Sequence, residues 1–359
     1  MNTSAHKFIG FLAAWILPAF PLFIAPTSVV ANVNWQTESE SPVISETISF
    51  ESHGAHLQGT LYLPAKGDRL PALVIMHGAE APTREYDMYR HLAQDLPALG
   101  YAVLVFDRRG SGASTGSLDD AGYEQLADDG IAGLHAIEAN PRVNGHKIGF
   151  WGHSQGGWLA ILAASRCHEA AFAISVSAPM VTPSEQMKFA VANLLTLRGQ
   201  QSAIIQATKT RDRWEGFLRG SNSRADAVAA LTAIEHEPWF SSVFMPRAED
   251  LVMDPLQSTW SKEKDLDPVV AFKQVKVPTL FFYGGADPWV PAAASRKRLN
   301  ELALTHPSIE VHVIEGADHA MEFNPHETMD FDKATILSAH PEAPRYFFLL
   351  ANWLDQNTR

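Results

Sequence analysis

The sequence predicts an α/β fold in which helices flank a mostly parallel central sheet, with an all-helical insertion late in the chain. Short apolar runs alternate with helix-like stretches over most of its length. Several of these runs are apolar at every position, as in strands that are buried on both faces. From 183 to 267 only helical patterns remain, and the alternation resumes afterwards. We therefore expect one α/β domain that carries a helical insertion.

The composition limits the possible partners of the protein. The chain has 359 residues, of which 46% are hydrophobic, enough for a large core. Its formal net charge of -12 argues against nucleic acid or an anionic membrane surface as a partner. Cys167 is the single cysteine, so no disulfide can form within the chain, and we expect its side chain to be buried.

The amino-terminal stretch has the pattern of a secretory signal. Lys7 is followed by an apolar run, and Ala31 offers a small residue at a plausible cleavage point. We therefore expect residues 1–31 to be a signal peptide, residues 32–43 to be a flexible segment, and the protein to be periplasmic or secreted, with no stable membrane span after cleavage. The alternative is an uncleaved membrane anchor, because the apolar stretch approaches the length that spans a bilayer. Three prolines within it disfavour a continuous spanning helix.

The first part of the α/β core is expected over 44–182. It begins with a hairpin, and its later apolar runs read as buried strands separated by helices. The predicted strands cover 47–51, 57–63, 72–76, 102–106, 147–151 and 171–176, and the predicted helices cover 85–96, 123–137 and 156–165.

The insertion, 183–267, is expected to be helical throughout. Its first helix shows one apolar stripe at helical spacing, formed by Met187, Ala190, Val191, Leu194 and Leu195. The second part of the core, 268–359, returns to strand and helix alternation. Strands are predicted over 279–283 and 309–314, and helices over 293–303 and 343–354.

Three side chains in the loops after predicted strands could together carry out acyl transfer. Ser154 lies within Gly152-His153-Ser154-Gln155-Gly156, between a strand and a helix, where a tight turn would expose its Oγ. Asp287 and His319 follow later strands, and the carboxyl ends of parallel strands meet at one sheet edge. Acyl transfer requires a nucleophile, a base and an acid that orients the base. We predict Ser154, His319 and Asp287 for these roles.

Other side chains near these loops are assigned different roles. Asp107 follows an earlier strand and is an alternative for the acid, whereas Asp318 lies beside His319 and is expected to cap its own loop. His153 is expected to pack or hydrogen-bond locally. The chain has no H-E-x-x-H pair and no Gly-Lys phosphate loop, so we expect neither a metal nor a cofactor.

The order Ser154, Asp287, His319, together with the turn around Ser154, resembles the α/β-hydrolase family over residues 45–354. The resemblance implies an oxyanion hole formed by the backbone N–H of Gln155 and a second N–H from His77-Gly78-Ala79, assigned to Ala79 with Gly78 as the alternative. It implies that the insertion is a lid. It also implies a mostly architectural role for the loop 106–114. Among subgroups, the chain is most similar to esterases and acyl hydrolases related to dienelactone hydrolases and prolyl-oligopeptidase-type catalytic domains.

The expected function is a serine hydrolase that cleaves a small-molecule carboxylic ester through an acyl-enzyme intermediate. A serine peptidase or a thioesterase of the same fold is the alternative. A non-catalytic ligand-binding protein is the alternative of another class, and the complete Ser, Asp and His set argues against it. Six insertion residues could either line an acyl pocket or form the core of the lid: Trp239, Phe240, Phe244, Met245, Met253 and Trp260.

Overall fold

The structure is a computed structural model that describes residues 42–79, 83–119, 121–306, 308–323, 341 and 343–358. The predicted signal peptide, 1–31, lies outside the described residues, as do 32–41 of the predicted flexible segment. Val43, the last residue of that segment, already belongs to the first strand and pairs with Pro64.

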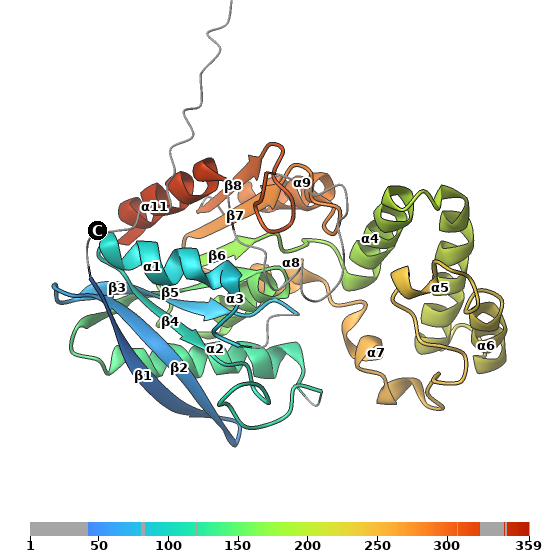
Figure 1. Ribbon diagram of the computed structural model, residues 1–359, viewed down its shortest axis with the longest axis horizontal. Helices are drawn as coiled ribbons and strands as arrows, with labels where there is room; N and C mark the ends of the chain where they lie inside the picture. The colour runs from blue at the N-terminus through green and yellow to red at the C-terminus, as the bar shows by residue number, and fades with distance from the viewer. Residues whose placement is uncertain are drawn as a thin grey trace, which may run out of the picture. The chain divides into compact units, whose positions relative to one another are not determined.

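The described residues contain one eight-stranded sheet, in the order β1-β2-β4-β3-β5-β6-β7-β8 (Figure 1). The pairs β1–β2 and β2–β4 are antiparallel, and all the other pairs are parallel. The sheet is therefore mostly parallel, as predicted. The strands are β1 Val43–Ser52, β2 Ala55–Pro64, β3 Leu70–Met76, β4 Ala102–Phe106, β5 Val143–His153, β6 Ala173–Val176, β7 Thr279–Gly284 and β8 Ile309–Ile314.

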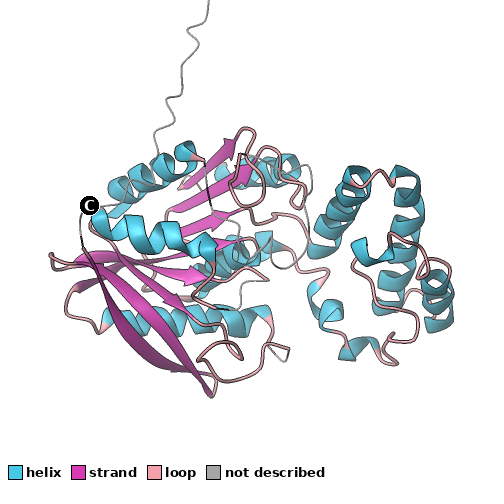
Figure 2. Cartoon of the chain, viewed as in Figure 1, coloured by secondary structure: helices cyan, strands magenta, loops and turns pink. Residues whose placement is uncertain are grey.

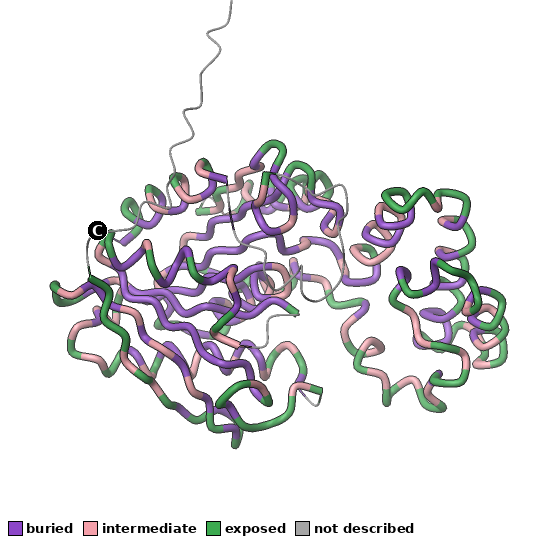
Figure 3. Tube along the Cα trace, viewed as in Figure 1, coloured by how far each residue is buried: buried purple, intermediate pink, exposed green. Residues whose placement is uncertain are grey.

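Helices cover both faces of this sheet. They are α1 Arg90–Ala98, α2 Tyr123–Glu138, α3 Gln155–Arg166, α8 Pro268–Phe272, α9 Ala292–Ala303 and α11 Pro344–Thr358. Successive side chains of a strand point to opposite faces. In β3, Val74 packs in a core with α2 and α3, whereas Leu73 and Ile75 pack in a second core with α1 and α11. The central strands are buried on both sides (Figure 3), which explains their continuously apolar sequences.

Between β6 and β7 the chain forms helices and loops only (Figure 2). Before α8, this stretch contains α4 Pro183–Leu197, α5 Ile204–Leu218, α6 Arg224–Thr232 and α7 Thr259–Glu263, with 3-10 turns at Gln201–Ala203, Phe240–Ser242 and Pro255–Gln257. The predicted apolar stripe of α4 faces inward, because Ala190, Val191, Leu194 and Leu195 are buried. No helix among the described residues has both the length and the apolar character needed to cross a bilayer.

The helix predicted over 85–96 begins later than expected. Its α-helical part starts at Arg90, after a 3-10 turn over Asp87–Tyr89. The Arg84 N–H donates to Oδ1 of Asp107 at 3.0 Å, and Tyr86 has an extended backbone with ψ 122°. The segment before the helix is therefore bonded to the loop after β4, a contact that no local pattern could reveal.

Candidate active site

Ser154 lies at the apex of a sharp turn between β5 and α3. Its φ of 54° and ψ of −123° are unusual for a residue with a side chain. The flanking glycines allow the turn to pack closely: a Cβ on Gly156 would lie 2.1 Å from the Met76 carbonyl oxygen, and one on Gly152 would lie 2.0 Å from that of Gly156. Neither position can accept a side chain without moving backbone, so the glycines permit the conformation that presents Ser154.

Asp287 and His319 are brought into direct contact. The Nδ1 of His319 donates to Oδ2 of Asp287 at 2.8 Å. The second carboxylate oxygen, Oδ1, accepts the backbone N–H groups of Trp289 at 2.7 Å and Val290 at 3.0 Å. The carboxylate is fully buried. These bonds fix its orientation, and its bond to Nδ1 leaves Nε2 of His319 available for a second partner.

The environment of His319 alters its proton affinity. Burial lowers the pKa of the imidazole, but the charge of Asp287, its hydrogen bond and the charge of Asp318 act in the opposite direction. The net result is a pKa of His319 above its usual value of 6.5. The pair therefore stabilises the imidazolium form, which a general base must adopt after it takes a proton.

His153, the last residue of β5, connects that strand to the loop that holds His319. Its Nε2 lies 2.9 Å from the carbonyl oxygen of His319, and the two ring centroids are 4.8 Å apart. Burial lowers the pKa of His153 to about 3, so the neutral ring donates this hydrogen bond. His153 thus packs and hydrogen-bonds as predicted, with a partner that lies 166 positions along the chain.

The predicted oxyanion-hole residues lie at the ends of β3 and β5, which are neighbours in the sheet. Gln155 is the first residue of α3, where backbone N–H groups have no partner within the helix. The Gly78 N–H donates to the hydroxyl of Tyr89 at 3.3 Å. Because Gly78 is occupied in this way, the geometry favours Ala79 as the second donor.

The two neighbouring aspartates have structural partners. Oδ1 of Asp318 accepts the N–H groups of Ala320 and Glu322, both at 2.9 Å, which confirms the predicted loop cap. Asp107 accepts the N–H of Arg84 at 3.0 Å and that of Ala113 at 2.9 Å, one on each oxygen. Asp107 therefore ties down the loop after β4, whereas Asp287 is the carboxylate in contact with His319.

A cavity of about 520 Å3 opens onto Ser154 and His319. Its walls come from both the sheet loops and the insertion, and most of the lining side chains are apolar or aromatic. Phe244 and Trp260 line this cavity, whereas Trp239 and Phe240 belong to the core of the insertion. Met253 does neither, because it is 76% exposed. Met245 packs against the cores of the insertion, so the other five predicted residues divide between the two expected roles.

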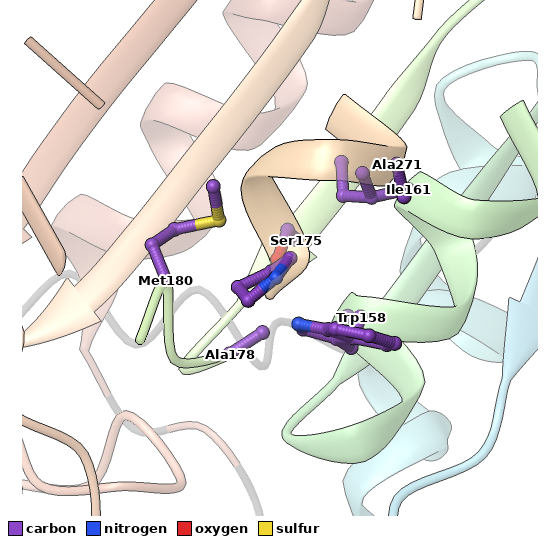
Figure 4. A pocket seen from close by; sticks show the side chains of 8 residues that line it. Trp158, Ile161, Ser175, Ala178, Met180 and Ala271 are labelled. Carbon is purple, nitrogen blue, oxygen red and sulfur yellow. The ribbon is translucent and has the colours of Figure 1, made fainter. Parts of the chain in front are cut away.

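A second, smaller gap lies behind α3, beside the Trp158 and Ile161 side chains (Figure 4). It has no room for a water molecule, so it is a packing defect and not a binding site. The hydroxyl of Ser175 is buried at this gap and has no hydrogen-bond partner among the described residues.

Comparisons with known proteins agree with this arrangement. The family model described as serine aminopeptidase, S33, matches residues 68–326. A thiohydrolase of Aspergillus aculeatus is 33% identical over 129 residues, which cover 35% of this chain and 39% of that protein. A lysophosphatidylserine lipase of Gallus gallus is 35% identical over 97 residues, which cover 27% of this chain and 24% of that protein. The chain therefore spans well under half the length of these relatives.

Solved structures share the fold at low sequence identity. An esterase of Pyrococcus furiosus matches with a TM-score of 0.53 and 16% identity, covering 89% of this chain and 92% of that one. A proline iminopeptidase of Mycobacterium smegmatis matches with a TM-score of 0.51 and 18% identity, covering 87% and 99%. Together with the sheet order, the turn at Ser154 and the family match, these comparisons lead to one conclusion: the chain belongs to the S33 serine aminopeptidase family and is a serine hydrolase of the α/β-hydrolase fold.

Proposed function

We propose that the protein hydrolyses carboxylic esters of small molecules, with Ser154 as nucleophile, His319 as general base and Asp287 as the acid that orients it. The observation that carries the proposal is the 2.8 Å contact between His319 and Asp287, at a cavity that Ser154 also lines. The runner-up activities, peptide and thioester hydrolysis, use the same groups and differ in the leaving atom.

In the proposed reaction, Nε2 of His319 takes the proton from Oγ of Ser154 as that oxygen attacks the ester carbonyl. The negative charge that develops on the carbonyl oxygen is stabilised by the backbone N–H groups of Gln155 and Ala79. The protonated His319 then gives its proton to the departing alcohol, which leaves an acyl group on Ser154. Water, deprotonated by the same base, releases the acid and restores the serine.

The lining of the cavity supports an ester over a peptide with a charged amino terminus. An aminopeptidase needs a carboxylate to pair with the substrate's ammonium group. None of the described residues that line the cavity is Asp or Glu. Apolar and aromatic walls, by contrast, suit an uncharged acyl group. The relatives named as a thiohydrolase and a lipase also favour an acyl substrate over a peptide.

A substrate panel tests this proposal. Nitrophenyl esters from acetate to palmitate would be compared with aminoacyl nitroanilides, for the wild-type protein and for Ser154→Ala. We expect ester turnover that Ser154→Ala abolishes, and labelling of Ser154 by a fluorophosphonate. Faster turnover of the anilides would establish the peptidase instead. Lack of both labelling and turnover would favour the non-catalytic binding protein.

We also propose that the protein is exported to the periplasm or secreted. The support is the sequence pattern of residues 1–31 alone. Expression of the full chain in a Gram-negative bacterium, followed by fractionation and amino-terminal sequencing, would test this. We expect a mature protein beginning at Asn32. A full-length protein that stays with the membrane fraction would indicate the anchor.

A further inference from the structure

Arg108 contacts both halves of the proposed oxyanion hole. Its Nη1 donates to the carbonyl oxygens of Gly78 at 3.0 Å and Ala79 at 2.9 Å. Its Nη2 donates to Oε1 of Gln155 at 2.5 Å. The residue is buried, with 4% exposure. One guanidinium group thus binds the loop after β3 and the first residue of α3.

The two contacts to carbonyl oxygens determine where the backbone N–H of Ala79 points. In a planar trans peptide, the carbonyl and the following N–H point in opposite directions. Because Arg108 holds the Gly78 carbonyl, the N–H of Ala79 must point away from Arg108. The carbonyl of Ala79 is held as well, so the peptide groups on both sides of Ala79 are fixed. An oxyanion hole depends on such fixed donors, since they need no reorganisation during the reaction.

The charge of Arg108 also strengthens the same donor. A cation that hydrogen-bonds to a carbonyl polarises that peptide group and makes its N–H a better donor. The polarised peptide is the one whose N–H belongs to Ala79. Lysine could not reproduce this arrangement, because its single ammonium lacks the planar fork that binds acceptors in several fixed directions.

We propose that Arg108 is a positioning residue that sets the geometry of the oxyanion hole, an inference that rests on the proposed esterase function. It adds a role for one residue to the mostly architectural role expected for the loop 106–114. Arg108 acts through Ala79 and Gln155 and does not itself touch the substrate. Its loss should therefore reduce kcat and leave ground-state binding, and thus KM, nearly unchanged.

Arg109 provides the matched control. It is the adjacent residue, is equally buried with 3% exposure, and binds Asp129 of α2 through Nε at 2.8 Å and Nη2 at 2.5 Å. Arg108→Lys, Arg108→Met and Arg109→Lys would be compared for melting temperature, kcat and KM. Gln155→Ala keeps the backbone N–H and removes one anchor of Arg108, which provides a milder variant should the buried substitutions fail to fold.

A trifluoromethyl ketone tests the oxyanion hole directly, because its adduct with Ser154 carries an oxyanion. A merely structural role of Arg108 would not change the Ki of this inhibitor. We expect both Arg108 variants to lose at least about tenfold in kcat, a fraction of the ~10²–10³ that one oxyanion donor supplies. Their Ki for the ketone should rise by the same factor, as transition-state binding requires. Gln155→Ala should show a smaller loss of the same kind, and Arg109→Lys should lower the melting temperature with kcat nearly unchanged.

Two results would overturn the inference. The first is that the folded Arg108 variants have the same kcat and the same affinity for the ketone as the wild type. If the Arg108 variants do not fold, the same result in Gln155→Ala would overturn the inference. The other is an equal loss of kcat in Arg109→Lys, which would indicate a general effect of the loop. The proposed function fails separately, if the wild-type protein shows no ester turnover that depends on Ser154. That measurement needs no variant of Arg108, so the two failures can be distinguished.

Discussion

The Nδ1 of His319 and the Oδ2 of Asp287 lie 2.8 Å apart, although the two residues are 32 positions apart in the sequence. They meet because β7 and β8 are adjacent parallel strands, and each residue lies in the loop that follows its strand. The carboxylate is held by two further backbone N–H groups, so the ring is oriented before any substrate binds.

Asp287→Asn should therefore reduce ester turnover by at least about a hundredfold, because an amide favours the wrong imidazole tautomer. The melting temperature should change little. Asp318→Asn is the control, since it caps a loop beside the same histidine. Steady-state kinetics would measure both. A larger loss of turnover in folded Asp318→Asn than in Asp287→Asn would show that the acid is misassigned.

The pH dependence of kcat/KM should follow the raised pKa of His319. The ring must be neutral to accept the serine proton, so activity should rise with pH through an apparent pKa above 6.5. In Asp287→Asn the charge that raises the pKa of His319 is lost, whereas burial still lowers that pKa. The inflection of the residual activity should therefore move to lower pH. An unchanged inflection in this variant would contradict the assignment.

The same pKa shift has a consequence for stability. Because the pKa of His319 is higher in the folded protein than in the unfolded chain, protonation favours folding. This contribution is complete below the unfolded value of ~6.5 and is lost as the pH rises through the folded value. Urea unfolding of the wild type and Asp287→Asn across this range would measure the contribution, which the variant should lack.

Ser154→Gly should be more stable than Ser154→Ala by about 1 kcal/mol, because glycine adopts a positive φ without steric cost. Both variants lack the hydroxyl of the proposed nucleophile, so the comparison concerns the backbone alone. Ser165 within α3 is the control, where glycine should be less stable than alanine by ~1 kcal/mol. Chemical denaturation of the four variants would test this, and the same sign at both positions would contradict it.

Ser175→Ala should leave the free energy of unfolding unchanged or raise it by up to about 1 kcal/mol, because the hydroxyl is buried without a partner among the described residues. Ser114→Ala should instead destabilise by ~1 kcal/mol or more. The hydroxyl of Ser114 donates to the Asp107 carbonyl at 2.7 Å and accepts the Gln58 N–H at 3.0 Å. Equal losses in the two variants would count against this explanation.

Glu215→Gln should loosen the insertion and spare the sheet. The carboxylate is fully buried and binds Ser184 at 2.5 Å, Arg211 at 3.2 Å and Trp260 at 3.3 Å. Removing one charge of a buried pair leaves the other uncompensated, at a cost of ~3–5 kcal/mol. Hydrogen exchange should accelerate within α4 and α5 and remain unchanged in β3 to β7.

Asp212→Asn on the same helix is the control for this prediction. Asp212 pairs with Lys188 at 2.7 Å, and the side chains of Lys188 and Asp212 are 36% and 53% exposed. Exposed pairs contribute only ~0–1 kcal/mol, so exchange should stay close to that of the wild type. Equal acceleration in the two variants, or acceleration throughout the sheet, would show that Glu215 is not the specific anchor of the insertion.

The sequence predicted those features that depend on local pattern. Strands 102–106 and 309–314 match the observed bounds, because the first is a continuous apolar run and the second alternates apolar with polar residues. The three proposed catalytic residues could be chosen because each follows a strand. Arg108 and His153 could not be assigned roles in this way. Their partners are brought to them by the parallel order of β3, β5 and β8, which no local spacing encodes.

The insertion carries its own apolar cores, and among the described residues these share no buried side chain with the cores that flank the sheet. Substitutions at separate, non-touching sites combine almost additively. Met187 lines the cavity and packs against one of these insertion cores, so a change there can alter which substrate is accepted with little effect on the proposed catalytic residues. Phe244, Gln186 and Asn193 differ, because they contact Trp289 or Pro288 in the loop that holds Asp287. A laboratory library within 183–267 that leaves these three residues unchanged can therefore vary the substrate range and preserve the proposed catalytic residues.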